Sequence, residues 1–416
     1  MVAWIVAALR EVGAVVTVVV HHQEDAVRAA LPECSFARQE APRGTGDALR
    51  AALANVPRTG PVIVCAGDTP LLTAAAISRL LAAHDGHVAT VAAFEAADPT
   101  GYGRMIAGVG IVEEGDCSAA QRSVRVVNSG LYVFDAAYLH DSLPRLLPHA
   151  PKGEYYLTDL IGPTANVVAG FDAGLFLGVN DRAALAEARA ILRRRIARSW
   201  ALAGVDFDDL GGVSIDFNVV LHPGATIGMG AVLEGACEIA GEVGPHCVLR
   251  DVKVAAGGRI LAGSHCVGAT VAAGAVVGPM ARLRPGAVID ENAHIGNFVE
   301  VKNTRVRSGA KANHLAYLGD ADVGENANVG AGAITCNYDG VRKHRTAIGA
   351  GAFIGSNAAL VAPVSIGDGA IVGAGTTVSV DVPADGIAVG RAPFRITANA
   401  ANRLRARYRL LAGLKS

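Results

Sequence analysis

One histidine and three cations in the C-terminal half have the types and spacing that chemistry requires. Arg284, Lys302 and Lys343 lie in a region otherwise poor in cations, and their side chains suit fork or point-charge contacts with phosphate. His314 lies between them in the segment NHLAY, and the ordinary pKa of histidine suits a general base near neutral pH. This group predicts a site that binds phosphate and moves a proton.

A second set of polar residues follows apolar runs in the N-terminal half. Asp68 comes directly after the apolar run 61–65, where a carboxylate is placed to bind Mg²⁺. The segment 128–130, Asn-Ser-Gly, lies within a later run. Because ligands of open α/β sheets bind beyond the carboxyl ends of the strands, Asp68 is a candidate ligand-binding residue.

Apolar runs alternate with Ala- and Leu-rich amphipathic segments up to about residue 202. This alternation predicts strands joined by crossover helices in a largely parallel sheet. We expect strands at 14–20, 61–65, 88–94 and 124–134, and helices at 26–31, 46–54, 74–84 and 181–203. Residues 1–9, which run into Arg10 and Glu11, fit an amphipathic helix better than a signal peptide.

The second half repeats every six residues, which is neither a helix period nor an ordinary strand period. Many of the recurring apolar residues precede glycine, as at a tight corner. The pattern predicts a parallel β-helix with three hexads in each triangular coil, from about 213 to 390. The recurring residues are Ile215, Leu221, Ile227, Leu233 and Ile239, then Val271, Val277, Leu283, Ile289, Ile295 and Val301, then Ile348, Ile354, Leu360, Ile366, Val372 and Val378.

Two stretches, 303–317 and 335–345, break this period. A solenoid tolerates insertions as loops on one face, which is commonly the binding face. We therefore expect loops at both places, with function gathered near them.

Ten sequence segments together resemble one enzyme family across essentially the whole chain. Those in the second half are GPMARLRPG, HIGNFVEVKN, KANHLAYLGDADVGENANVGAG and TCNYDGVRK; those in the first are RGTGDAL, CAGDTPL, DPTGYGRM, VVNSG, GEYYLTD and GVND. They resemble the bifunctional N-acetylglucosamine-1-phosphate uridylyltransferase and glucosamine-1-phosphate acetyltransferase family. The resemblance implies an α/β nucleotidyltransferase-like domain, Rossmann-like and GT-A-like, followed by an all-β left-handed β-helix of hexapeptide repeats.

The resemblance also assigns roles in acetyl transfer from acetyl-coenzyme A to glucosamine 1-phosphate. His314 would be the catalytic base, because the attacking sugar amine must lose a proton. The sugar phosphate would be held by Arg284, Lys302, Tyr317, Asn328 and Lys343. Acetyl-coenzyme A would be bound by Ala331, Asn337, Tyr338, Ser356, Ala374 and Arg391, of which Asn337 and Tyr338 lie near the acetyl group.

The second implied reaction transfers a uridylyl group from UTP to N-acetylglucosamine 1-phosphate and releases pyrophosphate. Asp68 and Asn180 would bind Mg²⁺, which offsets the repulsion between two highly charged substrates. Gln39, Gly44 and Thr45 match the uracil-reading segment, whereas Gly103, Glu113, Asn128 and Thr158 match positions around the sugar phosphate. Asn180 also counts among the nucleotide-sugar ligands.

One part of the family pattern has no counterpart in the sequence. The family begins with a strand and a Gly-rich loop that cradles the triphosphate, and Met1 matches a position roughly forty residues further on, in the helix after that loop. We therefore expect an N-terminally truncated first domain with a split sheet, and doubtful uridylyltransferase activity.

Three alternatives remain open at this stage. One is an acetyltransferase alone, with a vestigial first domain. The second is a trimeric carbonic-anhydrase-like lyase with three histidines on zinc, for which the candidates are His222, His246, His265, His294 and His314. The third is a non-catalytic exchange-factor subunit of translation initiation.

Composition limits the partners and the organisation of the chain. A net charge of −1 with 18% charged residues gives no footprint for nucleic acid or an anionic membrane, and no apolar run is long enough to span one. Seven scattered cysteines indicate neither a disulfide framework nor a thiolate zinc site. We expect a cytoplasmic protein with domains at 1–179 and 206–394, a linker helix at 180–205 and a helical tail at 395–416, and the family resemblance implies a homotrimer.

Overall fold

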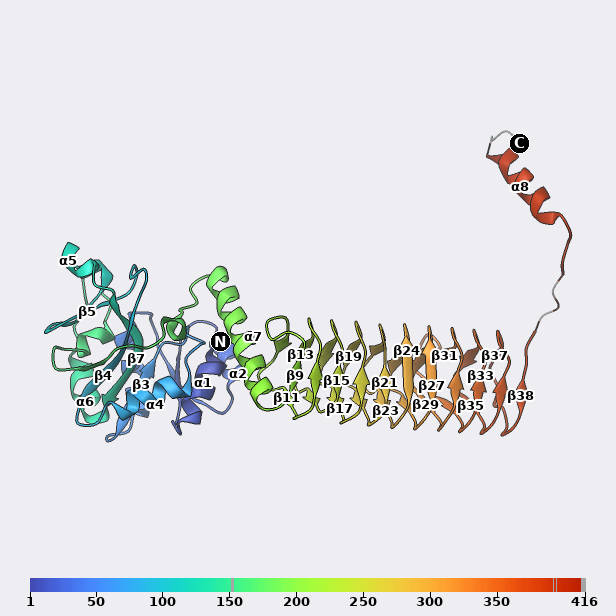
Figure 1. The fold of residues 1–416 in the computed structure, drawn as a ribbon, viewed down its shortest axis with the longest axis horizontal. Helices are drawn as coiled ribbons and strands as arrows, with labels where there is room; N and C mark the ends of the chain where they lie inside the picture. Colours follow the sequence, from blue (N-terminus) through green and yellow to red (C-terminus); the bar gives the residue numbers. More distant parts are fainter. Residues whose placement is uncertain (151–152, 392, 394, 413–416) are drawn as a thin grey trace. The chain divides into compact units, whose positions relative to one another are not determined.

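The computed structural model describes residues 1–150, 153–391, 393 and 395–412. The chain divides into two compact units, Met1–Leu192 and Arg193–Ser416, which are described separately below (Figure 1). The dividing point lies inside one long helix, α7 (Arg182–Leu202). The finer domain boundaries expected from the sequence stay a prediction.

The first unit is built on a sheet whose centre is β7, and this sheet is mixed rather than parallel. β7 pairs antiparallel with β3, β4 and β5, and only β8 runs parallel to its neighbour β4. The expectation of a largely parallel sheet is therefore wrong here, because the central strand β7 runs opposite to all three of its neighbours, and β5 and β6 in the order β6-β5-β7-β4-β8 are antiparallel as well. The strands are β3 (Pro61–Cys65), β4 (Ala89–Glu95), β5 (Arg104–Ile106), β6 (Gly110–Val112), β7 (Val126–Asp135) and β8 (Asn166–Val168).

The expected elements of this unit are confirmed, with ends that shift by up to three residues. Thr73 caps α4 by accepting from the backbone N–H of Ala76, and Asp135 caps α6 in the same way through Tyr138. The helices are α1 (Val2–Glu11), α2 (Glu24–Ala30), α3 (Thr45–Ala52), α4 (Ala74–Ala82), α5 (Ala119–Arg122), α6 (Ala136–Ser142) and α7.

The two strands β1 (Thr17–Val20) and β2 (Ser35–Arg38) form a separate parallel pair. Among the described residues they share no ladder with the larger sheet, so the sheet is split as expected. The absence of a Gly-rich loop from the protein stays a prediction.

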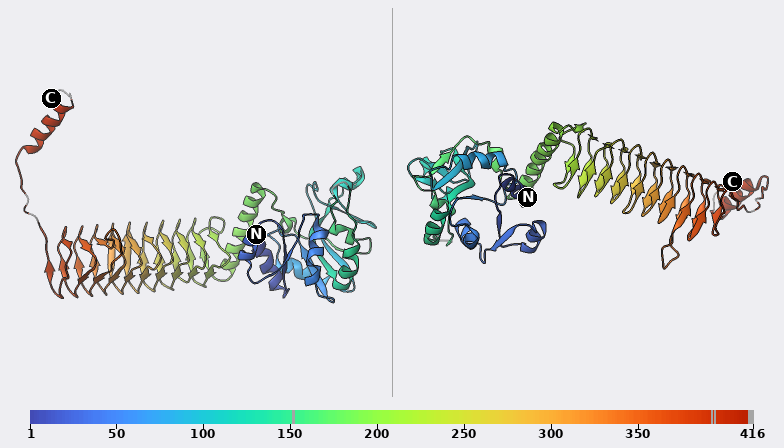
Figure 2. Two further views of the ribbon diagram at one scale, coloured as in Figure 1. Left: turned by 180° about the vertical axis from the view of Figure 1, so that it is seen from behind. Right: turned by 90° about the horizontal axis from the view of Figure 1, so that it is seen from below.

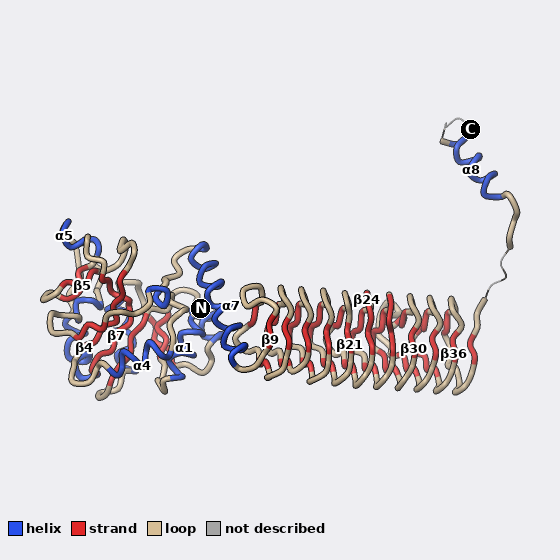
Figure 3. Tube along the Cα trace, in the orientation of Figure 1, coloured by secondary structure: helices blue, strands red, loops and turns tan. Residues whose placement is uncertain are grey.

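The second unit is a parallel β-helix whose coils stack three sheets (Figures 1 and 3). The sheet that contains His314, called the His314 sheet, has eleven strands: β9 (Asp206–Phe207), β12 (Thr226–Ile227), β15 (Glu242–Val243), β18 (Arg259–Ile260), β21 (Val276–Val277), β24 (His294–Asn297), β27 (Lys311–His314), β30 (Asn328–Val329), β33 (Phe353–Ile354), β36 (Ile371–Val372) and β38 (Ile387–Ala388).

The sheet that contains Lys302, called the Lys302 sheet, has ten strands, and the third sheet has nine. The Lys302 sheet comprises β10 (Ser214–Ile215), β13 (Val232–Glu234), β16 (Val248–Arg250), β19 (His265–Val267), β22 (Arg282–Leu283), β25 (Glu300–Lys302), β28 (Tyr317–Gly319), β31 (Ile334–Cys336), β34 (Ala359–Val361) and β37 (Thr377–Val378). The third comprises β11 (Val220–Leu221), β14 (Glu238–Ile239), β17 (Lys253–Val254), β20 (Thr270–Val271), β23 (Val288–Ile289), β26 (Arg305–Val306), β29 (Ala321–Val323), β32 (Thr346–Ile348) and β35 (Val364–Ile366).

The six-residue period is confirmed by burial. Every recurring aliphatic residue named above is buried in one continuous core. A buried alanine often stands two positions earlier, as at Ala225 before Ile227 and Ala275 before Val277. The large and small side chains together fill the narrow interior of each coil, and the core continues only because neighbouring coils stack.

Only one of the two breaks in the period is a loop. The chain leaves the stack after β31 and returns at β32, and the loop between them is visible in the right-hand view of Figure 2. Ala321 nevertheless pairs directly with Thr346, so the ladder closes beneath the loop. The loop expected at 303–317 is wrong: β26 and β27 occupy that stretch, and its coil is only shortened, with His314 placed 17 residues after its neighbour Asn297.

Replacing Ile289 by alanine is expected to destabilise the β-helix by about 2–5 kcal/mol. The side chain is fully buried in the single core, so its loss leaves a cavity between coils that the ladders hold at fixed spacing. Urea unfolding followed by a signal specific to the β-helix measures the change. A loss below 0.5 kcal/mol, on the scale of a surface substitution, would contradict this prediction.

The last helix, α8 (Ala400–Leu411), lies within the tail expected at 395–416. All its residues after Ala400 are exposed, including the basic Arg403, Arg405, Arg407 and Arg409. None of the helices in the described part of the chain is both long and apolar enough to cross a membrane.

Candidate active site

His314 belongs to a column of residues that runs along one corner of the β-helix. The register of the His314 sheet aligns Ile295, Ala312, Val329, Ile354 and Val372 in successive coils. The residues two positions further on therefore stack in the same order: Asn297, His314, Ala331, Ser356 and Ala374. The last three were predicted from the sequence to bind acetyl-coenzyme A, and an extended ligand along this corner would meet all of them and His314.

Asn297 contacts His314 and was not singled out from the sequence. The Asn297 Oδ1 atom lies 2.8 Å from Nδ1 of His314. An amide oxygen only accepts, so this contact places the ring proton on Nδ1 and leaves the Nε2 lone pair available. Asn297 and His314 are 17 residues apart, which is close to the roughly 18 residues of one coil, and this spacing could have predicted from the sequence that they are neighbours.

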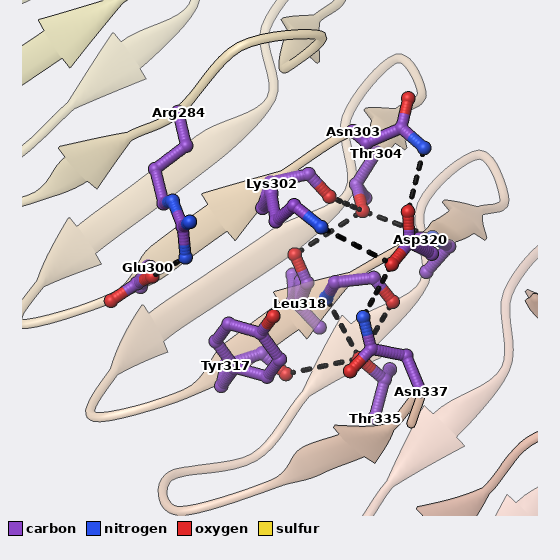
Figure 4. A network of polar contacts seen from close by, with 12 residues as sticks. Arg284, Glu300, Lys302, Asn303, Thr304, Tyr317, Leu318, Asp320, Thr335 and Asn337 are labelled. Carbon is purple, nitrogen blue, oxygen red and sulfur yellow. Dashed lines mark hydrogen bonds and ion pairs between the residues drawn. The ribbon is translucent and has the colours of Figure 1, made fainter. Parts of the chain in front are cut away.

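Two of the three predicted cations, Arg284 and Lys302, lie in or next to the Lys302 sheet (Figure 4). Arg284 follows β22, and its Nη1 atom lies 2.9 Å from Oε1 of Glu300. The Nζ atom of Lys302 lies 3.5 Å from Oδ2 of Asp320, a buried carboxylate that sequence reasoning missed. Both cations have an acidic partner, so part of their charge is already balanced within the chain.

Lys343 comes from the loop and approaches Lys302. Hydrogen-bond contact with Lys302, and then the positive charge of Lys302, lower the pKa of the Lys343 amine. The same contact raises the pKa of Lys302, and the nearby Asp320 carboxylate acts in the same direction. We infer that Lys302 keeps its proton and that the pair favours an anion, because a phosphate between two amines removes their repulsion.

Tyr317 lies beside Lys302 because its ring covers a glycine. Gly319 is the ladder partner of Lys302, and a Cβ atom there would lie 2.5 Å from the Tyr317 hydroxyl. Any side chain at 319 would displace the ring. Asn328 lies on β30 in the His314 sheet, so the structure does not place it in the sheet of the cations with which it was grouped.

The loop holds the two predicted acetyl-coenzyme A residues in different environments. Asn337 is 8% exposed and donates through Nδ2 to Asp320, whereas Tyr338 is 59% exposed and donates to the carbonyl of Gly340. Arg391, in the same predicted group, lies on the exposed chain after β38. Asn337 is thus fixed by the fold, and Tyr338 is open to a ligand.

Asp339 organises the loop from within. Its carboxylate accepts from the backbone N–H groups of Val341 and Arg342 and lies 2.7 Å from His344 Nε2. Hydrogen bonds from the Arg342 backbone and the His344 side chain lower the pKa of Asp339 to about 2. The lowered pKa means that these contacts favour the ionised carboxylate. Their stabilising effect is fully present above the ordinary pKa of aspartate and is lost as pH falls toward 2.

Replacing Asp339 by alanine is expected to loosen this loop without unfolding the coils, because the ladder closes beneath it from Ala321 to Thr346. Limited trypsin digestion at neutral pH should cleave after Arg342 or Lys343 several-fold faster than in the parent chain. Asp385→Ala, in a corner further along the β-helix, is the matched control. Equal cleavage rates in all three proteins would show that Asp339 does not order the loop.

In the first unit, Asp68 and Asn180 are brought together as predicted. The Val179 backbone N–H donates to the carbonyl of Asp68 at 2.9 Å. A Cβ atom on Gly178 would lie 3.6 Å from Asn180 Nδ2 and 3.9 Å from Asp68 Oδ2, so both side chains reach the same small region. One carboxylate and one amide oxygen, with water completing the shell, fit the preference of Mg²⁺ for few protein oxygens.

The predicted uracil-reading residues are also close together. Gln39 donates through Nε2 to the carbonyl of Gly44 at 3.2 Å and to Oδ2 of buried Asp47 at 3.0 Å. Gly44 has φ of +94°, and a Cβ atom there would lie 2.6 Å from the Tyr155 carbonyl, so glycine is required. Thr45 accepts at Oγ1 from the Leu157 backbone N–H at 3.1 Å. Asp47 is a further residue that the sequence did not single out.

The four residues predicted around the sugar phosphate, Gly103, Glu113, Asn128 and Thr158, form two hydrogen-bonded pairs. Thr158 donates to Oε1 of Glu113 at 2.7 Å, and the Asn128 backbone N–H donates to the Gly103 carbonyl at 2.9 Å. The Asn128 amide donates to the Tyr132 hydroxyl, whose pKa is raised by burial. A Cβ atom on Gly103 would lie 3.4 Å from Glu113 Oε2, so the structure brings the residues predicted for the sugar together.

Two family models match the chain. A MobA-like NTP transferase domain matches residues 1–155, and the bacterial transferase hexapeptide model, with six repeats, matches residues 345–379. One solved structure, a mutant of perosamine N-acetyltransferase from Caulobacter crescentus in complex with CoA and GDP-perosamine, covers 30% of this chain at 23% identity and a TM-score of 0.26.

Curated relatives match nearly the whole chain. The bifunctional protein GlmU of Sorangium cellulosum is 42% identical over 97% of this chain and 90% of its own length. The GlmU proteins of Kineococcus radiotolerans and Bordetella parapertussis are each 44% identical over 91% of this chain, and 81% and 87% of their own lengths are covered. This similarity excludes the lyase and the exchange factor as alternatives, and the chain belongs to the GlmU family of bifunctional acetyltransferase and uridylyltransferase enzymes.

Proposed function

We propose that His314 and the three cations carry out acetyl transfer from acetyl-coenzyme A to the amine of glucosamine 1-phosphate. The observation that carries this assignment is the column in which His314 stacks with Ala331, Ser356 and Ala374. Acetyl-coenzyme A would lie along this column, near Tyr338, with its thioester next to His314.

The amine nitrogen attacks the thioester carbonyl, forming a C–N bond and breaking the C–S bond. His314 Nε2 accepts the proton that the amine loses, and the departing thiolate leaves as coenzyme A after protonation. Asn297 keeps the other ring proton on Nδ1, so Nε2 is ready to accept. Arg284, Lys302 and Lys343 bind the phosphate, with Tyr317 and Asn328 as further contacts to the sugar.

We propose that the first unit then transfers the uridylyl group. A phosphate oxygen of N-acetylglucosamine 1-phosphate attacks the α-phosphorus of UTP, and pyrophosphate leaves. Asp68 and Asn180 would hold Mg²⁺, which when bound neutralises charge on the phosphates. Gln39, Gly44 and Thr45 would read the uracil, and Gly103, Glu113, Asn128 and Thr158 would hold the acceptor sugar.

We further propose that the acetyltransferase works as a homotrimer in the cytoplasm. Hexapeptide acyltransferases commonly build their sites between neighbouring solenoids. Beside the column, Phe298 is 60% exposed and Leu315 is 63% exposed, and both have positive φ, which is costly for large side chains. Such residues suit a surface covered by a second copy, and light scattering of the full chain at several concentrations tests the trimer.

Two assays on the full chain test the function and its remaining alternative. The first measures thiol release from acetyl-coenzyme A with glucosamine 1-phosphate. The second measures pyrophosphate release from UTP with N-acetylglucosamine 1-phosphate and Mg²⁺. Both products are expected from the bifunctional enzyme; thiol alone would favour the acetyltransferase with a vestigial first domain, and a folded protein that releases neither would overturn both assignments.

A further inference from the structure

Asp320 is a buried carboxylate at the centre of the acetyltransferase site, and no role was predicted for it from the sequence. It follows β28, is 6% exposed and has φ of +51°. Its backbone N–H donates to the carbonyl of Lys302 at 3.0 Å, and its own carbonyl accepts from the backbone N–H of Thr346 at 3.2 Å. The residue is therefore anchored both to the coil of Lys302 and to the point where the loop rejoins the stack.

Both carboxylate oxygens of Asp320 accept from neighbouring side chains (Figure 4). Oδ1 accepts from Asn303 Nδ2 at 2.6 Å. Oδ2 accepts from Asn337 Nδ2 and lies 3.5 Å from Lys302 Nζ. The donors come from the coils on both sides of Asp320, so one carboxylate links Lys302, a proposed phosphate contact, to Asn337, which was predicted from the sequence to bind acetyl-coenzyme A.

The charges around Lys302 explain why a carboxylate is needed. Lys343 lies close to Lys302, Arg284 adds a third positive charge, and Tyr317 lies beside Lys302. Glu300 offsets the charge of Arg284, with Oε1 lying 2.9 Å from Nη1. Asp320 is the carboxylate paired with Lys302, next to the amines of Lys302 and Lys343. Without it, repulsion between the amines would favour loss of a proton and weaken phosphate binding.

We propose that Asp320 is a positioning residue of the acetyltransferase, which, held by Asn303, keeps the Lys302 ammonium protonated and directed at the substrate phosphate and fixes the Asn337 amide. This inference rests on the proposed function for the identity of the substrate. The contact between Asp320 and Lys302 does not depend on the identity of the substrate, so the role of Asp320 and the proposed function can be tested separately.

Asp320→Asn is the informative variant. Asparagine keeps the size and tolerates positive φ. Because Asn303 donates to one oxygen while Asn337 and Lys302 approach the other, either orientation of the new amide sets its NH₂ group against a donor. Asp322→Asn is the matched control, since Asp322 is a carboxylate two residues away that pairs with Arg307 at 2.7 Å instead of with Lys302.

The first measurement is independent of activity. Trace labelling of the full chain with acetic anhydride, with the Lys302 peptide resolved by mass spectrometry, follows the unprotonated amine as a function of pH. Asp320→Asn is expected to lower the pKa of Lys302, and each unit of decrease raises labelling about tenfold at a pH below that pKa. Labelling of Lys302 in Asp322→Asn should match the parent chain.

The second measurement is the KM for glucosamine 1-phosphate in the thiol-release assay. Asp320→Asn is expected to raise this KM about tenfold or more. The pH at which KM begins to increase should be lower than in the parent chain. Pyrophosphate release should stay unchanged. Unchanged labelling and KM, or equal changes in Asp322→Asn, would overturn the proposal. A parent chain that releases no thiol while Lys302 labelling still responds to Asp320→Asn would overturn the proposed function alone.

Should Asp320→Asn fail to fold, Asn303→Gly provides the second test. Glycine suits the positive φ of 45° at this position and removes the 2.6 Å hydrogen bond to Asp320. A rise in KM for glucosamine 1-phosphate in the same direction supports the proposal. Parent values for both KM and Lys302 labelling in a folded Asn303→Gly protein would contradict it.

Discussion

His314→Ala is expected to lower the rate of thiol release by about 10²–10⁴-fold, the range over which a positioned acid or base contributes. The amine of glucosamine 1-phosphate would still bind through its phosphate, but no side chain at the column would accept its proton. KM for the sugar phosphate should therefore change less than kcat. Thiol release from acetyl-coenzyme A under saturating substrates measures the effect.

Two comparisons separate loss of the base from loss of structure. Pyrophosphate release, carried out by the other unit, should stay at the parent rate. Asn297→Ala should give a smaller loss of thiol release, since the ring keeps its base but loses the 2.8 Å contact that orients it. If His314→Ala retains most of the activity while folded, another group is the base and the proposed mechanism is wrong.

Asp68→Ala is expected to reduce pyrophosphate release by about 10²-fold or more, because charge stabilisation by a bound metal is worth several kcal/mol. The backbone contact between the Asp68 carbonyl and Val179 does not involve the side chain, so the fold should be kept. Pyrophosphate release measured against Mg²⁺ concentration should show a raised metal requirement.

The control for Asp68→Ala is Asp25→Ala, which removes an exposed carboxylate on α2 of the same unit. Pyrophosphate release by Asp25→Ala should match that of the parent chain. Thiol release should match the parent chain in both variants. Equal pyrophosphate release from Asp68→Ala and Asp25→Ala would remove Asp68 from the metal site. The assignment of Asn180 would then lose its partner as well.

The β-helix could be predicted from the sequence because its rule is local. A buried aliphatic residue at every sixth position fixes which side chains point inward, and the coils then stack by repetition. Burial of residues such as Ile227 and Ile354 follows directly from that rule. Strands β1, β3, β4 and β7 and helices α1 to α4 and α7 of the first unit were also found, because each contains its own periodicity, whereas the short elements β2, β5, β6, β8, α5 and α6 were not predicted.

Two features could not be predicted from local patterns. The antiparallel pairing of β7 with β3 and β4 depends on chain reversals that join distant segments, and the apolar runs themselves are compatible with either direction. Asp320 was missed because an aspartate followed by alanine looks like an ordinary turn residue. Its importance comes from Asn303 and Asn337, which belong to other coils and meet it only after stacking.

The loop between β31 and β32 is inserted within a single coil, since β31 stacks on β28 and β32 stacks on β29 of the preceding coil. The length and sequence of the loop can therefore change without changing the pairing of the strands that form the coils. Grafting a different loop between Cys336 and Thr346 should leave the scaffold intact while changing which acceptor is recognised. The same architecture offers a route by which new acyl acceptors arise through insertion and deletion alone.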